Sequence, residues 1–284
     1  MRRPIGITAL VLALAVLVIL VLALRQGIRI PLPAVSTWRH VTLGAQGPIY
    51  RGTSSESAQG ITQVTVQAPS VGDVQVTTAP GSQVSWRWSV AGSRNGVMQA
   101  RAAGGVLTLT YTPPTPLQWN FSSMPDVLQV QVPPGLNADI TVATGRATIT
   151  GTYRAVTADV TTGALTVRNF RGRLTGDVAT GPLSAQAVQA TGQLNLQVGT
   201  GPLDFSGDPG LQSSFSVGTG PLTLQLAPHG RLHVQAAAHL GPMSSSFPGL
   251  SGGTNGVFSG TIGQGQAGTL TVDDSTGPVS ITPQ

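Results

Sequence analysis

The sequence predicts an all-β protein, a β-solenoid or β-helix-like stack of ~18–21-residue turns that follows one transmembrane helix. Three observations lead to this prediction. A Thr-Gly pair returns at a nearly constant interval, apolar and polar residues alternate on both sides of it, and 20 residues near the N-terminus carry no charge. A fixed period of this size is typical of repeat architectures, in which each repeat buries its apolar face against the next.

The uncharged segment runs from Ile5 to Leu24 and is apolar on every side. A helix of this length spans ~30 Å, the thickness of the hydrocarbon layer of a membrane. A signal anchor is favoured over a cleaved signal peptide, because the run exceeds ~7–15 residues and no small-residue cleavage site follows it. We therefore expect residues 1–28 to be a single-pass membrane anchor with the β domain outside the cytoplasm. Secretion after signal-peptide cleavage is the alternative.

The region between the anchor and the regular repeats is expected to contain less regular strands. Residues 29–60 are predicted to be a linker with the first strands, and residues 61–135 an N-terminal β region that caps the solenoid, because an uncovered solenoid end would expose strand edges. Period-two alternation predicts strands over 61–68, 71–78, 84–90, 106–111 and 127–132.

Residues 136–284 hold the repeat, which reads as strand, corner, strand. In the first complete block, Val156, Ala158 and Val160 precede the corner and Leu165 and Val167 follow it, with polar or small residues between them. A glycine occupies the corner, where it supplies a backbone conformation that is costly for other residues. A meander of antiparallel hairpins is the rival arrangement, and one degenerate turn is expected between the last two corners. The predicted corner glycines are Gly145, Gly163, Gly181, Gly201, Gly220, Gly241 and Gly277.

The net charge of +5 and the isoelectric point near 11.0 call for a test of nucleic-acid binding. Arg2, Arg3, Arg25 and Arg29 flank the apolar segment, and from Pro31 onward 11 Arg face 10 acidic residues, a net of +1. No basic stripe with interleaved aromatic residues is present, so we expect no nucleic-acid partner. The chain has no Cys, which excludes disulfides and thiolate chemistry.

Two runs, VTVQAPSVGDVQVTTAPGSQVSWRWSV and DVLQVQVPPGLNADITVATGRATITG, precede the repeated Thr-Gly turns. Together they resemble the bacterial family of putative adhesins, which are β-strand-repeat proteins built around a domain of unknown function, many with one membrane-spanning segment near the N-terminus. The resemblance covers residues 61–281. It implies a β-solenoid-like fold and a cell-envelope setting, and it supplies no catalytic or binding residues.

One local basic patch stands out, because residues 143–173 contain five Arg and one Asp, a net of +4. Such a patch is suited to an anionic envelope polymer or to lipid head groups. A solvated face without a ligand is the alternative. The patch consists of Arg146, Arg154, Arg168, Arg171 and Arg173.

Acidic residues and histidines also recur. Asp159, Asp177 and Asp273 each lie four residues before a corner glycine and are expected to face outward, where Arg pairing, solvation or calcium binding would offset their repulsion. His229, His233 and His239 share one parity, and solvated or structural roles are favoured over metal binding. We expect no metal site and no cofactor.

No nucleophile elbow, phosphate-binding loop or zinc-protease motif occurs in the sequence. The leading interpretation is a non-enzymatic, membrane-anchored cell-envelope protein that acts as an adhesin-like binding or structural module. A carbohydrate-active β-helix enzyme and an envelope-stress accessory protein are the alternatives. The expected partners are the membrane, through Ile5–Leu24, and an envelope glycan, a lipid head group or another envelope protein. The sequence does not indicate an oligomeric state.

Overall fold

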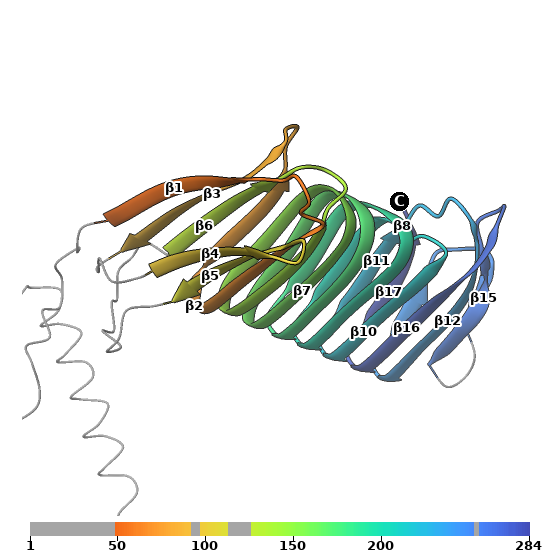
Figure 1. Cartoon of the computed structure of the whole chain (residues 1–284). Coiled ribbons are helices and arrows are strands. Elements are labelled where there is room, and N and C mark those ends of the chain that lie inside the picture. Colours follow the sequence, from red (N-terminus) through yellow and green to blue (C-terminus); the bar gives the residue numbers. More distant parts are fainter. Residues whose placement is uncertain (1–48, 92–96, 113–125, 253–255) are drawn as a thin grey trace, which may run out of the picture.

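The computed structural model describes residues 49–91, 97–112, 126–252 and 256–284. These residues form strands joined by turns, which confirms the all-β prediction for this part of the chain. None of them belongs to a helix long and apolar enough to cross a membrane, and the predicted anchor, Ile5–Leu24, lies outside the described residues. Figure 1 shows the strands following one another along one long axis.

The stack begins with β2 (Gln63–Thr78), a long strand that bends once. Its first half pairs in parallel with β5 (Val106–Thr112) on one side and with the start of β7 (Asn137–Thr180) on the other. Its second half lies between β6 (Asp126–Val132) and the next part of β7. The register shifts between Ala68 and Val71, where β2 bends. The half of β2 before this bend starts the first parallel ladder, and the half after it starts the second.

Antiparallel strands extend the sheet beyond β2. β4 (Val97–Ala103) pairs with β5, while β3 (Gln83–Ala91) pairs with β6 and with β1 (Ile49–Ser57). Alternation in the sequence predicts β3, β5 and β6. It misses β4, because the segment VMQARAA does not alternate between apolar and polar residues.

The regular part of the stack consists of β7, β8 (Leu183–Thr200), β9 (Leu203–Asp208), β10 (Gln212–Thr219) and β11 (Leu222–Leu226). Each residue here lies beside its equivalent one repeat away. Leu183 pairs with Leu165 and Leu203, and Val198 pairs with Val178 and Val217, all in parallel. The strands of these repeats are therefore parallel neighbours, and the rival meander of antiparallel hairpins is wrong for them.

A column of glycines lines one corner of the stack. A Cβ placed on any of these glycines after Gly72 would collide with the carbonyl oxygen of the glycine on the adjacent repeat, so the backbones approach too closely there for a side chain. Five of these glycines also have φ values between +133° and +142°, a region that L-residues rarely adopt. The column runs in the spatial order Gly72, Gly145, Gly163, Gly181, Gly201, Gly220, Gly277 and Gly241.

That order reveals an insertion, because the last described repeat lies between two repeats that follow each other in the chain. β16 (Ala267–Thr276) lies between β10 and β12 (Arg231–Leu240), and β17 (Val279–Pro283) lies between β11 and β13 (Met243–Ser245). Figure 1 shows β16 in this position. The segment expected as a degenerate turn instead forms β14 (Leu250–Gly252) and β15 (Val257–Ile262), which pair with each other and through β15 with β12, both antiparallel.

The core is the space between the two parallel ladders. A short connection joins the two ladders within each repeat. Most inward positions are aliphatic, as in the buried residues Ile140, Leu196 and Leu224. Two aromatic pairs fill its wider part: the rings of Tyr153 and Phe170 stack 5.8 Å apart, and those of Phe205 and Phe215 meet edge to face at 4.9 Å. The core is therefore apolar and continuous from β2 to β17.

Candidate functional site

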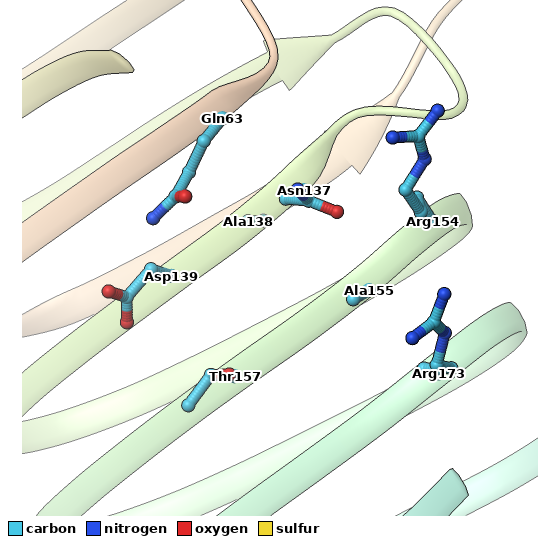
Figure 2. A pocket seen from close by; sticks show the side chains of 8 residues that line it. All are labelled: Gln63, Asn137, Ala138, Asp139, Arg154, Ala155, Thr157 and Arg173. Atoms are coloured by element: carbon cyan, nitrogen blue, oxygen red, sulfur yellow. The ribbon is translucent and has the colours of Figure 1, made fainter. Parts of the chain in front are cut away.

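Two cationic side chains, those of Arg154 and Arg173, line a recess on the outer face of the first repeats. β7 supplies most of the lining, because it passes through successive repeats and returns to the same face each time. β2 adds one residue from the repeat before. The recess has a volume of about 310 Å³ and is lined by Gln63, Asn137, Ala138, Asp139, Arg154, Ala155, Thr157 and Arg173 (Figure 2).

Arg154 and Arg173 have exposed side chains that rise from adjacent passes of β7 on the same side of the recess (Figure 2). Among the described residues, no carboxylate lies within 4.0 Å of either guanidinium group. Neighbouring strands are ~4.8 Å apart, so two like charges are held close together without a counter-charge. Water and salt screen the repulsion between the two exposed groups, and an anion beside them could form charge-assisted hydrogen bonds with both.

The structure separates the other three arginines of the predicted patch from this recess. Arg146 lies on the second ladder, 3.9 Å from the carboxylate of Asp73. Arg168 and Arg171 are exposed in β7, opposite Gln186 and Gln189 of β8, and do not line the recess. Of the five arginines, Arg154 and Arg173 therefore line the recess.

Asn137 contributes an unsatisfied group to the recess. Its amide oxygen Oδ1 is buried, and no hydrogen-bond donor in the described part of the chain reaches it. Its backbone N–H donates to the carbonyl of Thr62, which fixes the start of β7 against the preceding repeat. A buried acceptor without a donor is unfavourable, so a rotation of the side chain that brings Oδ1 to a donor in the recess would be favoured.

Three acidic residues, Asp139, Asp159 and Asp177, lie near one another on the face that carries the recess. Burial and the nearby carboxylates of Asp177 and Asp139 raise the pKa of Asp159 above its ordinary value. No Arg lies within 4.0 Å of Asp159 or Asp177 in the described residues, so the expected Arg pairing is not formed. The described residues also contain no group of three or more His, Cys, Asp or Glu side chains that could hold a metal ion.

Two of the three histidines pair with carboxylates. His229 Nδ1 lies 2.6 Å from Oδ2 of Asp208, whose other oxygen accepts hydrogen bonds from the backbone N–H groups of Gly210 and His229. His239 Nε2 lies 3.1 Å from Asp273 on β16. His233 contacts only Gln235, at 3.5 Å, so the three histidines do not converge.

Asp274 is a buried carboxylate in a position that other repeats fill with a hydrophobic residue. It lies between Val217 and Ala238, and both of its oxygens are buried without a well-formed hydrogen bond among the described residues. Burial raises the pKa of Asp274; Asp273 adds to this effect, while the backbone N–H of Thr276 and the nearby His239 oppose it. The sequence analysis did not single out Asp274.

The sequence analysis also missed the polar residues of the recess. Gln63, Asn137 and Thr157 carry no motif, and their grouping depends on which residues of successive repeats become neighbours. The repeat period could have indicated this grouping, because residues one period apart, such as Ala155 and Arg173, line the same recess.

No family model and no curated protein sequence matches the chain. Among solved structures, it is similar to a putative cell adhesion protein from Clostridium sporogenes, with a TM-score of 0.40 and 10% identity over 84% of this chain and 100% of that one. A putative adhesin from Bacteroides fragilis also has a TM-score of 0.40 and 10% identity, over 83% and 97% of the two chains. A putative adhesin from Parabacteroides distasonis has a TM-score of 0.26 and 10% identity, over 83% and 98%. We therefore infer function from the residues of this chain.

Proposed function

We propose that the chain is a non-enzymatic, membrane-anchored protein of the cell envelope, in which a β-solenoid acts as an adhesin-like binding module. The observation that carries this proposal is the recess around Arg154 and Arg173. Its two guanidinium groups have no protein counter-charge, and the amide oxygen of Asn137 has no donor. Such a site has groups ready to hold a polar, anionic ligand from solution.

The proposed solenoid architecture is supported by the register of the ladders. Equivalent residues of successive repeats are parallel neighbours, and the glycine column keeps the corners in line. A stack of this kind makes a rigid, elongated body whose outer face repeats at ~4.8 Å intervals. This geometry suits an extended ligand that runs along the surface.

The proposed location is supported by the uncharged segment Ile5–Leu24 and the Pro-containing residues that follow it. A single cysteine placed in this cysteine-free chain reports the location of the β domain. With a membrane-impermeant maleimide, Gln186→Cys, an exposed position, is expected to react on intact or outer-membrane-permeabilised cells. The buried position Leu196→Cys is the matched control and reacts only after denaturation.

Reaction of Gln186→Cys only after lysis of the inner membrane would contradict the extracytoplasmic location. The mass of the mature chain distinguishes an anchor, which keeps residues 1–28, from a cleaved signal peptide. Binding is tested by co-sedimentation of the full-length protein, in detergent, with purified envelope fragments. Failure to sediment with any envelope fraction would refute the binding role, and release of new sugar ends from the fragments would favour the enzymatic alternative.

A further inference from the structure

We propose that the recess lined by Asn137, Asp139, Arg154 and Arg173 binds a carboxylate-bearing sugar unit of an acidic polysaccharide. The inference rests on the proposed envelope-binding function and names the ligand of that same site.

The charge of the recess favours a single negative charge. Arg154 and Arg173 contribute +2 and Asp139 contributes −1, which leaves +1. A carboxylate balances this charge, whereas a phosphate monoester carries about −1.5 to −2 near neutral pH. The carboxylate of Asp139 would repel the additional negative charge of a phosphate. One sulfate ester carries a single charge, as a carboxylate does, but a heavily sulfated polymer brings several such groups close to Asp139 and would be repelled more strongly.

The unsatisfied oxygen of Asn137 adds a second requirement. Oδ1 accepts hydrogen bonds only, and it is buried in the unliganded protein. A rotation of the Asn137 side chain that turns Oδ1 into the recess would let it accept an O–H or N–H from the ligand. A carboxylate or sulfate group supplies no donor at neutral pH. A sugar ring supplies several hydroxyl groups next to its acid group, so one sugar acid meets both requirements.

The two requirements are met on different sides of the recess. Figure 2 shows Arg154 and Arg173 on one side, with Gln63 and Asp139 on the other and Asn137 between them. Guanidinium groups bind carboxylates through two parallel hydrogen bonds, which places the acid group on the arginine side. The amide of Gln63, the hydroxyl of Thr157 and the carboxylate of Asp139 then face the hydroxyl groups of the ring.

The size of the recess agrees with one or two sugar rings. Its volume of about 310 Å³ lies at the small end of the range for ligand sites. None of its eight lining residues is aromatic, so a sugar would be held by polar contacts instead of ring stacking. Specificity should then depend strongly on the acid group.

The test compares three polymers for binding to the full-length protein in detergent. Polygalacturonate carries one carboxylate on each unit, its methyl ester has the same backbone without the charge, and dextran sulfate carries a higher charge density. We expect polygalacturonate to bind, with about ten- to a hundredfold weaker binding of the methyl ester, the range expected when charge-assisted hydrogen bonds are lost. Dextran sulfate is expected to bind more weakly than polygalacturonate, and Asp139→Asn should improve its binding.

The double variant Arg154→Gln/Arg173→Gln is expected to lose polygalacturonate binding by a similar factor. Arg168→Gln/Arg171→Gln removes the same charge outside the recess and is expected to bind as the wild type does. All four side chains are exposed, and unchanged melting temperatures verify that folding is retained.

Equal binding of polygalacturonate and its methyl ester would overturn the carboxylate assignment, and equal loss in the two double variants would overturn the assignment to the recess. Wild-type binding of dextran sulfate as tight as that of polygalacturonate would show that charge alone acts. If none of the polymers binds but the protein still sediments with envelope fragments, this inference fails while the proposed function survives. If it sediments with no envelope fraction, the proposed function fails as well.

Discussion

His229 Nδ1 lies 2.6 Å from Oδ2 of Asp208, a residue one repeat earlier in the chain. The two side chains differ in exposure: Asp208 keeps 11% of its side-chain surface, and His229 keeps 79%. The other oxygen of Asp208 accepts from two backbone N–H groups, those of Gly210 and His229. The carboxylate thus joins the turn after β9 to the turn after β11.

Replacing Asp208 by Ala should destabilise the protein by about 1–3 kcal/mol, because two backbone donors and one imidazole nitrogen lose their acceptor. His229→Ala should cost less, since its ring is largely in water. Urea unfolding measures both values. Asp204→Ala, an exposed position four residues before Asp208, is the control and should change stability by less than about 0.5 kcal/mol. Equal effects of Asp208→Ala and Asp204→Ala would show that the turn does not depend on this carboxylate.

Asp274→Val should stabilise the protein near neutral pH by about 1–3 kcal/mol, because it replaces a buried carboxylate that has no good partner. Burial raises the pKa of Asp274 above its ordinary value of 3.8 in the folded state. The stability contributed by proton binding is therefore complete below 3.8 and is lost as the pH rises through the raised folded-state pKa.

The advantage of Asp274→Val should consequently be small near pH ~3.5 and grow toward pH ~7. Unfolding by urea across this range measures the difference. Asp273→Asn, at the exposed neighbouring position, controls for the loss of one negative charge and of the contact with His239. Destabilisation by Asp274→Val at neutral pH would mean that the carboxylate has a stabilising partner.

Gly181→Val should destabilise the protein by at least about 2 kcal/mol. Its φ is +133°, and a Cβ at this position would meet the carbonyl oxygen of Gly163. Thr200→Ala, an exposed corner residue, should have an effect below about 0.5 kcal/mol. Thermal unfolding compares the two variants, and equal melting temperatures would refute the structural role of the glycine column.

Deletion of residues 267–284 should expose β12 and β13 to proteases, because β16 and β17 are their parallel partners among the described strands. Limited proteolysis followed by mass spectrometry should place the first cuts of the truncated protein within 231–252. The repeats before residue 219 should resist at the same protease concentration. Identical cleavage of the full-length and truncated proteins would show that the inserted repeat does not hold these strands.

Strand positions followed from the sequence wherever one face is buried, because burial requires alternation. The pairing of His229 with Asp208 could also be predicted from the sequence, because 21 residues separate them and the period is ~18–21. The contacts of Asp273 and Asp274 could not, because they depend on the insertion of β16 between β10 and β12. The repeat period does not show that the repeat with β16 and β17 precedes the repeat with β12 and β13 in the spatial order of the stack.

The recess was predictable only in part. A count of local charge singled out Arg154 and Arg173, but it also included Arg146, which lies on the other ladder beside Asp73. Charge counting along the chain ignores which face of a bent strand a residue occupies. The role of Asn137 depends on the burial of a single oxygen atom, which no sequence pattern encodes.

The position of β16 and β17 determines when β12 and β13 can pair with the rest of the stack during synthesis. In an ordinary linear array, each repeat can dock as soon as it leaves the ribosome or the translocon, because its neighbour is already in place. Here residues 231–245 must wait for residues 267–284, which enter between them and the earlier repeats. A chain that ends early therefore lacks two layers of the stack and keeps an open strand edge. Residues 267–284 thus connect the strands of residues 231–245 to the rest of the stack.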